Sequence, residues 1–181
     1  NTFDPRALID TSPGTMKVGR YTVRDVHSYG VLDMAGVLRK SSNVGAARIG
    51  LSMTATQFHE TLVRLGFGRL TGSGFPGEAP GLVPAPRLWR LSTQVTVSYG
   101  YGIASNALQL TRAYAALATG GLLPEVTLLA RDPGTPGMGR RVLPADVAHA
   151  IKAMLEGAVA TGGTGTRAQV AGYRVAGKTG T

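Results

Sequence analysis

The 181-residue sequence predicts a mixed α/β (α+β) fold that is mostly helical with few strands. Five stretches place apolar residues at helical spacing, and most of them begin at a residue type that caps helices. Only short stretches alternate polar and apolar residues as strands do. The composition, 43% apolar and 16% charged, is typical of a globular protein, and the length is that of one domain.

Two segments rich in proline and glycine predict loops. Residues 1–31 are expected to cross the surface, with residues 21–23 as their only strand-like piece. Residues 66–86 form the second loop, in which Glu78 is expected to be a surface carboxylate or part of a local network. Residues 94–99 alternate polar and apolar side chains and predict an extended segment.

Two consecutive helices are predicted on either side of a short polar break. Asp33 is expected to cap a helix that runs into Lys40, and Asn43 to cap a second helix over residues 44–52. Ser41 and Asn43 then lie off the regular helix surface, where a hydroxyl and an amide can point into one cleft. The alternative, that these polar residues are only helix caps, stays open at this point.

Three further helices are predicted between clear start and stop signals. The signals are Thr54 and Gly66, Asn106 and Gly120, and Pro144 and Gly162. The middle helix has one apolar face made by Ala107, Leu110, Tyr114, Leu117 and Ala118. Residues 126–131 and 141–143 look strand-like on either side of a turn, and residues 174–181 are expected to form a closing strand.

Composition argues against several kinds of site. The sequence has no cysteine, and its three histidines lack metal-ligand spacing, so neither a metal nor another cofactor is expected. The formal charge is +9, but the arginines are scattered and do not interleave with aromatic residues, which disfavours nucleic acid as a partner. No apolar run reaches the length of a membrane span, and the first residues do not have the pattern of a signal peptide.

The segment that ends the sequence admits two interpretations. Residues 172–179 match the phosphate-binding pattern G-x-x-x-x-G-K-[ST], but a glycine turn precedes them and Tyr173 and Val175 suit an extended strand better. The other interpretation is a strand that carries K-T-G, a signature of penicillin-binding proteins and serine β-lactamases. Lys178 is unusual in a chain with fifteen arginines and four lysines, which indicates a place for a compact ammonium group.

Further motifs accompany K-T-G in a fixed order. They are K-S-S-N-V-G at residues 40–45, S-Y-G-Y-G at 98–102, the helix at 108–118, G-T-G at 163–165 and G-Y-R-V-A-G-K-T-G-T at 172–181. In this order the sequence resembles the class B penicillin-binding proteins over nearly all of its length. It is most similar to the septal peptidoglycan D,D-transpeptidases of Gram-negative bacteria, and the resemblance implies a penicillin-binding protein or serine β-lactamase-like transpeptidase fold.

The resemblance implies an acyl-transfer site. A serine in S-x-x-K attacks the peptide bond between two terminal D-alanines, and the acyl group then passes to an amine of a neighbouring stem peptide. By this resemblance Ser41 belongs to the proton relay, and Asn43 hydrogen-bonds the substrate. Lys178 supplies positive potential near Ser41 and the substrate carboxylate.

The same resemblance assigns substrate-binding residues. Thr179, Gly180 and Thr181 are expected to align the substrate as an added strand, with the Thr181 backbone N–H as half of an oxyanion hole. Tyr99 and Tyr101 are expected to line the cleft, although packing of a turn is an equally good interpretation for both.

One departure from the family affects the mechanism. No serine stands three residues before Lys17, Lys40, Lys152 or Lys178, so the nucleophile of S-x-x-K is absent from the sequence. We therefore expect residues 1–181 to be a partial transpeptidase domain that lacks the S-x-x-K helix upstream and the strands after K-T-G. Such a piece by itself is expected to be inactive.

The resemblance also implies a setting and partners. They are the periplasmic face of the inner membrane, peptidoglycan stem peptides, β-lactams bound through the missing serine, and membrane proteins of the division machinery. Alternatives on the same fold are a D,D-carboxypeptidase, a β-lactamase and a β-lactam sensor. A non-catalytic binding homologue is the alternative from another class.

Overall fold

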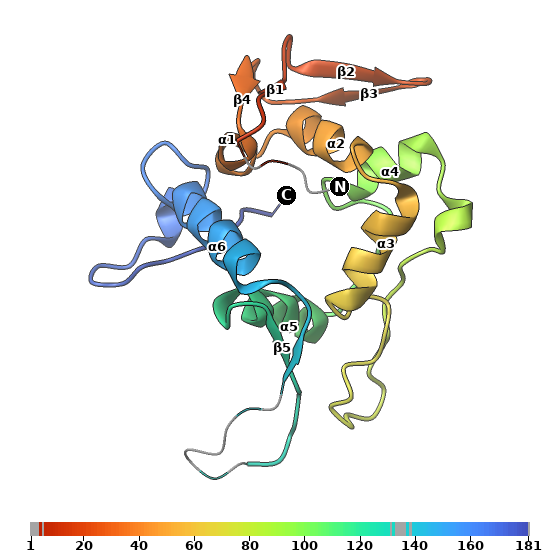
Figure 1. The fold of residues 1–181 in the computed structure, drawn as a ribbon, viewed down its shortest axis with the longest axis vertical. Helices are drawn as coiled ribbons and strands as arrows, with labels where there is room; N and C mark the ends of the chain where they lie inside the picture. Colours follow the sequence, from red (N-terminus) through yellow and green to blue (C-terminus); the bar gives the residue numbers. More distant parts are fainter. Residues whose placement is uncertain (1–3, 5, 131, 133–136, 138, 181) are drawn as a thin grey trace. The chain divides into compact units, whose positions relative to one another are not determined.

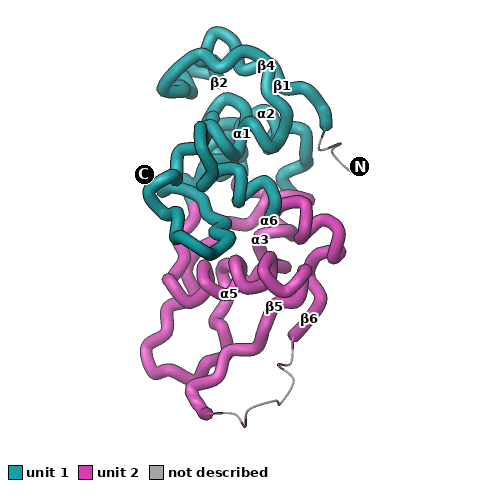
Figure 2. Tube along the Cα trace, turned by 90° about the vertical axis from the view of Figure 1, so that its left-hand side faces the viewer, with its two compact units in different colours: residues 1–55, 89–102, 152–181 teal, residues 56–88, 103–151 magenta. Residues whose placement is uncertain are grey.

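The computed structural model describes residue 4, residues 6–130, residues 132 and 137, and residues 139–180. The chain divides into two compact units, which Figure 2 colours separately. Unit 1 comprises residues 1–55, 89–102 and 152–181, and unit 2 comprises residues 56–88 and 103–151. The sequence motifs at residues 40–45, 98–102 and 172–180 all lie in unit 1.

Unit 1 consists of two small antiparallel sheets and helices (Figure 1). Its strands are β1 (Ile9–Asp10) paired with β4 (Val31–Leu32), and β2 (Thr15–Val18) paired with β3 (Tyr21–Arg24). Its complete helices are α1 (Met34–Lys40), α2 (Asn43–Leu51), α4 (Leu91–Val97) and the short 3-10 helix η2 (Thr166–Ala168). The helix α6 (Ala145–Val159) contributes its second part, from Lys152 onward.

The core of unit 1 lies between the β2–β3 hairpin and two helices. Val18 and Val23 point inward from the hairpin, and they meet buried side chains of α2 and α4. The α2 and α4 members of this cluster are Val44, Ala47 and Val95. Burial of each valine contributes about 1.5–3 kcal/mol. The hairpin and α2 are therefore fixed against each other directly beside the Ser41–Asn43 break.

Unit 2 has its own core. It contains α3 (Ala55–Arg64) apart from its first residue, η1 (Pro86–Leu88), α5 (Ala107–Ala118), the antiparallel strands β5 (Leu122–Pro124) and β6 (Gly139–Arg141), and the first part of α6. Ala116, Leu123 and Val142 form its buried cluster. The mixed, mostly helical fold class with few strands is thus confirmed, since the described strands form three two-stranded sheets.

Several predicted boundaries and caps are confirmed. The Asp33 side chain accepts a hydrogen bond of 2.7 Å from the Gly36 N–H at the start of α1. Asn106 and Gln109 form a capping box at the start of α5. Glu78 belongs to a local network, as predicted, because it accepts hydrogen bonds from the Thr71 N–H and the Ser73 hydroxyl. The Thr71 N–H is the main cause that lowers the pKa of Glu78.

The extended segment predicted at residues 94–99 is wrong, because Leu91–Val97 forms α4. β-branched residues give this stretch little helical preference of its own. Tertiary contacts decide its conformation: the Gln94 amide donates hydrogen bonds to the carbonyls of Gly50 and Met53, and Val95 is 1% exposed in the core. A helix places these two side chains on the surface that meets α2.

The face predicted for α5 is also wrong in part. Leu110 and Tyr114 are 47% and 39% exposed, whereas Gln109, Ala113 and Ala116 are buried. Gln109 is accommodated inside because its amide donates to the carbonyls of Arg69 and Pro80. A polar side chain with satisfied hydrogen bonds can therefore take an interior place that apolar periodicity assigns elsewhere.

The strand predictions were the least accurate. The sequence predicts a loop with one strand over residues 1–31, but this segment contains β1, β2, β3 and the first residue of β4. The strands around the later turn lie at 122–124 and 139–141, because Leu123 is the residue that packs into the core. Residues 126–130 belong to no strand, and Arg131 lies outside the described residues. Residues 174–180 likewise form no strand, since no described segment pairs with them.

Candidate active site

Ser41 lies at the end of α1 in an uncommon backbone conformation. Its φ of 55° and ψ of 43° are left-handed, and among the described residues it is the one non-glycine residue with positive φ. Such a conformation costs a non-glycine residue about 1–2 kcal/mol. The turn ends α1, directs the exposed Ser41 side chain away from the helix surface and lets a new helix begin two residues later.

The next two residues are tied to the β2–β3 hairpin. Ser42, rather than Asn43, is the N-cap of α2, which corrects the predicted cap: its hydroxyl accepts a hydrogen bond from the Gly45 N–H. The Ser42 hydroxyl in turn donates to Asp25 at 2.6 Å. Asn43 is the first helical residue, and its side-chain amide donates to the Arg24 carbonyl at 3.0 Å. This bond turns the Asn43 amide nitrogen toward the hairpin and leaves its oxygen as the group that can accept from a ligand.

Lys178 reaches the same break from the other end of the sequence. Its Nζ donates to the Ser41 hydroxyl at 2.7 Å, although 137 positions separate the two residues. The ammonium group also contacts the carbonyl and hydroxyl oxygens of Thr179 at 3.2 Å and 3.3 Å. The structure thus brings together the Ser41 hydroxyl, the Asn43 amide and the Lys178 ammonium group, which the sequence motifs predict as site residues.

A hollow of about 300 Å³ surrounds these groups. Its lining comes from α1, the break, α2, the end of α4 and the K-T-G segment: Val37, Leu38, Ser41, Ser42, Asn43, Ala46, Ser98, Tyr99, Lys178, Thr179 and Gly180. Tyr99 is therefore placed in the cleft, whereas Tyr101 is not among the lining residues and instead packs edge-on against Tyr99, with ring centroids 5.9 Å apart. Thr181 lies outside the described residues.

Burial alters the titration of two residues in this hollow. Desolvation lowers the pKa of Lys178 below the usual lysine value of 10.5. Desolvation raises the pKa of Tyr99, and the neighbouring Tyr101 adds to the effect. Burial thus disfavours the charged form of both side chains, the ammonium of Lys178 and the phenolate of Tyr99.

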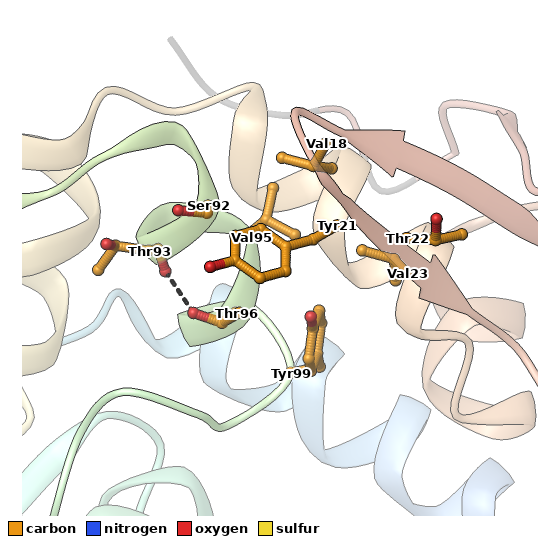
Figure 3. A pocket seen from close by; sticks show the side chains of 9 residues that line it. All are labelled: Val18, Tyr21, Thr22, Val23, Ser92, Thr93, Val95, Thr96 and Tyr99. Carbon is orange, nitrogen blue, oxygen red and sulfur yellow. Dashed lines mark hydrogen bonds between the residues drawn. The ribbon is translucent and has the colours of Figure 1, made fainter.

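A second hollow, of about 220 Å³, lies between the β2–β3 hairpin and α4 (Figure 3). Its walls include Tyr21 and Thr22 from the hairpin and Thr93 and Thr96 from α4. Tyr99 lines both hollows, so its ring forms part of the wall between them. No charged side chain lines this second hollow among the described residues.

Two contributors to the site were missed in the sequence. Asp25 holds the break through Ser42 and also accepts from the Val44 N–H at 3.0 Å. The Thr164 hydroxyl lies 2.9 Å from the Thr179 hydroxyl. The G-T-G motif around Thr164 is a signal in the sequence that could have indicated this residue. Asp25 follows β3 without any motif around it, so the sequence gives no such signal for it.

The described residues around Lys178 do not form a phosphate-binding loop. Residues 174–180 open no helix, so the backbone arrangement of a P-loop is missing around Lys178. Within the part of the chain that the structure describes, no three His, Cys, Asp or Glu side chains gather as metal ligands. The helices described there include none that is both long and apolar enough to cross a bilayer.

Relatives of known name resemble the chain over nearly its whole length. Peptidoglycan D,D-transpeptidase FtsI of Escherichia coli (strain K12) is 35% identical over 175 residues, which cover 97% of this chain and 29% of FtsI. A probable peptidoglycan D,D-transpeptidase PenA of Neisseria gonorrhoeae is 38% identical over 178 residues, covering 98% of this chain and 30% of PenA. The chain thus spans about three tenths of the length of these relatives.

A solved structure and a family profile agree with these relatives. The apo structure of the TP domain of Burkholderia pseudomallei penicillin-binding protein 3 matches with a TM-score of 0.91 and 37% identity, over 96% of this chain and 53% of that one. The family described as the penicillin binding protein transpeptidase domain matches residues 1–181. The resemblance to class B penicillin-binding proteins is confirmed, and the chain belongs to the penicillin-binding protein transpeptidase domain family.

Proposed function

We propose that the protein to which this chain belongs is a peptidoglycan D,D-transpeptidase that cross-links stem peptides through a serine acyl-enzyme during septal wall synthesis. The observation that carries this proposal is the 2.7 Å contact between Lys178 Nζ and the Ser41 hydroxyl in a hollow that also holds Asn43. Membership of the transpeptidase family supports it. Residues 1–181 constitute a partial transpeptidase domain in this proposal.

The proposed acylation step uses Ser41 and Lys178 of the hollow together with a serine from outside this sequence. A serine hydroxyl of S-x-x-K, which is not among these 181 residues, attacks the carbonyl carbon of the D-Ala–D-Ala bond. An ester C–O bond forms, the C–N bond breaks, and D-alanine leaves with a proton that Ser41 relays. Lys178 holds the Ser41 hydroxyl and, with its lowered pKa, accepts and returns protons more readily than a solvated lysine.

The substrate is oriented by the remaining polar groups. The Asn43 oxygen accepts from an amide N–H of the peptide, since its nitrogen is already bonded to the Arg24 carbonyl. The Lys178 ammonium group and the Thr179 hydroxyl attract the terminal carboxylate. We assign to Gly180 a place along the peptide, and to the N–H of Thr181, which lies outside the described residues, the role of an oxyanion donor. Tyr99 forms an apolar part of the cleft wall, and the ring of Tyr101 contacts it edge-on.

In the second step an amine from a neighbouring stem peptide attacks the ester. The new amide bond forms, the C–O bond to serine breaks and the serine recovers its proton, which leaves the enzyme unchanged. The proposed setting is the periplasmic face of the inner membrane, with membrane proteins of the division machinery as partners. β-Lactams acylate the same serine.

The experiment is acylation of the full-length protein by a fluorescent penicillin, followed by release of D-alanine from a stem-peptide substrate in the presence of an acceptor amine. Covalent labelling together with a cross-linked product supports the proposal. Ser41→Ala and Lys178→Ala are each expected to lower the acylation rate by about 10²–10⁴-fold, the contribution typical of a positioned acid or base.

The other activities give different results in the same assay. Release of D-alanine to water despite the acceptor indicates a D,D-carboxypeptidase, and rapid hydrolysis of penicillin indicates a β-lactamase. A stable penicilloyl adduct with no D-alanine release indicates a β-lactam sensor. Absence of any label indicates a non-catalytic homologue and contradicts the proposal.

A further inference from the structure

The C-terminal end of α6 receives its cations from another helix. The last turn of α6 carries no basic residue, whereas the last turn of α1 carries Arg39 and Lys40. Arg39 donates through its guanidinium to the Thr161 carbonyl, and Lys40 donates through Nζ to the Gly162 carbonyl at 3.2 Å. Adjacent residues of α1 thus bind adjacent carbonyls of the segment that follows α6.

This arrangement has an electrostatic basis. Each helix ends with unpaired carbonyls and about half a negative charge, so the two C-terminal ends of α1 and α6 disfavour each other's approach. Arg39 and Lys40 place two positive charges where these ends meet. Hydrogen bonds from charged donors are stronger than neutral ones, which makes them suited to hold backbone groups in place.

The segment that they bind, residues 161–165, is called here the glycine turn. Its Gly163 N–H donates to the Ala160 carbonyl and its Gly165 N–H to the Ala158 carbonyl, both at 2.9 Å. A Cβ at Gly163 would stand 2.2 Å from the Ala158 carbonyl oxygen. The backbone of the turn therefore packs directly on the last turn of α6 and has little room for another conformation.

The far side of the glycine turn contacts the K-T-G segment. The hydroxyl of Thr164 lies 2.9 Å from the hydroxyl of Thr179, and the Gly177 N–H donates to the Leu155 carbonyl of α6 at 3.2 Å. Lys178 lies between these two attachment points in the sequence. The position of its ammonium group is thus linked to α6 and the glycine turn.

We propose that Arg39 and Lys40 are positioning residues which, through the glycine turn, set the spacing between the Ser41 hydroxyl and Lys178 Nζ. Ser41 directly follows these two cations, and Lys178 directly precedes Thr179, so one short turn connects both partners of the 2.7 Å contact. The inference rests on the proposed acyl-transfer function. Neither cation touches substrate in this scheme; each acts through the backbone that it holds.

The test uses the full-length protein and separates the acylation rate constant from the dissociation constant of the non-covalent penicillin complex. Arg39→Met and Lys40→Met are each expected to lower the rate constant about tenfold, as loss of one charged hydrogen bond implies, and to leave the dissociation constant within about twofold. Arg39→Lys and Lys40→Arg keep a charged donor and are expected to restore most of the rate.

Controls distinguish positioning from a general loss of structure. Arg20 contacts the hydroxyl and the ring of its neighbour Tyr21. Arg20→Met removes these contacts and is expected to leave the acylation rate constant unchanged. Thr164→Val removes the hydroxyl contact on the other side of the turn and is expected to lower the rate constant like Lys40→Met. It provides the same test should a cation variant fail to fold.

Two results would overturn the inference. One is a methionine variant that acylates at the wild-type rate while Lys178→Ala does not. The other is a crystal structure of Lys40→Met in which Ser41 Oγ and Lys178 Nζ remain within hydrogen-bond distance. A wild-type protein that penicillin never labels contradicts the proposed function instead, and the crystal structure still decides the role of the cations.

Discussion

The Asp25 carboxylate accepts a hydrogen bond from the Ser42 hydroxyl at 2.6 Å and another from the Val44 N–H at 3.0 Å. These two bonds hold the start of α2. Ser42 is 2% exposed, so its hydroxyl has no water to replace this partner. The carboxylate also lies at the N-terminal end of α2, where negative charge is favourable. The hairpin thereby fixes the backbone on both sides of Asn43.

Asp25→Asn is expected to lower the free energy of unfolding by about 1.5–3 kcal/mol, because the amide replaces one acceptor oxygen by a donor that faces another donor. Denaturant unfolding of the full-length protein measures this change. Asp146→Asn, which alters an exposed aspartate in the first turn of α6, is the matched control and is expected to cost about 1 kcal/mol or less, because it loses only the favourable place of a negative charge at a helix N-terminus. Equal effects of the two changes would contradict the role given to Asp25.

Ser41 is expected to show opposite effects on stability and activity. Ser41→Gly relieves a left-handed strain of about 1 kcal/mol, and it also removes the hydroxyl that Lys178 contacts. We expect an unchanged or higher melting temperature together with a strongly reduced rate of penicillin acylation.

Ser41→Ala keeps the Cβ and therefore the strain. It is expected to lose acylation to the same degree without the gain in melting temperature. A Ser41→Gly protein that melts below Ser41→Ala would show that the left-handed conformation is not strained.

Lys178 is expected to titrate below 10.5, because burial disfavours its charged form. The folded state then binds this proton less tightly than the unfolded state, so folding is disfavoured while both states are protonated. The free energy of unfolding should rise with pH from the folded-state pKa up to 10.5 and stay level above it.

Carbon-13 NMR of the lysine Cε groups of the full-length protein measures this titration directly. Lys178→Arg keeps the charge at every pH and should abolish the pH dependence that this residue contributes. A Cε resonance of Lys178 that titrates at or above 10.5 would refute desolvation as the dominant effect.

Two glycines near the end of α6 are expected to respond in opposite ways to alanine. At Gly163 a Cβ meets the Ala158 carbonyl oxygen at 2.2 Å, and Gly163→Ala should cost about 1–3 kcal/mol, as overpacking does. At Gly157, inside the helix, nothing lies within 4 Å of the added Cβ, and Gly157→Ala should stabilise by about 1 kcal/mol.

Thermal melting of the two variants side by side measures the difference. Gly163→Ala is also expected to slow acylation, because the glycine turn contacts Thr179, whereas Gly157→Ala is not. Stabilisation by both alanines would contradict the packing described for the turn.

Local signals in the sequence were sufficient for the features that depend on neighbouring residues. Asp33 and Asn106 were recognised as caps because a cap needs only the three residues that follow it. At α2 the predicted N-cap is one residue too late, because Ser42 and not Asn43 is the N-cap. Ser42 is preferred there because its hydroxyl can accept from Gly45 and donate to Asp25 at once.

The sequence by itself was sufficient to predict the family, the order of the motifs and the site residues Ser41, Asn43 and Lys178. Each motif consists of adjacent residues, so it can be recognised without the fold. Only the tertiary structure decided that Leu91–Val97 is helical and that Asp25, Thr164 and the two cations of α1 support the site. These outcomes depend on hydrogen bonds and burial between segments far apart in the chain. The energy of such contacts exceeds the small local preferences that a sequence pattern records.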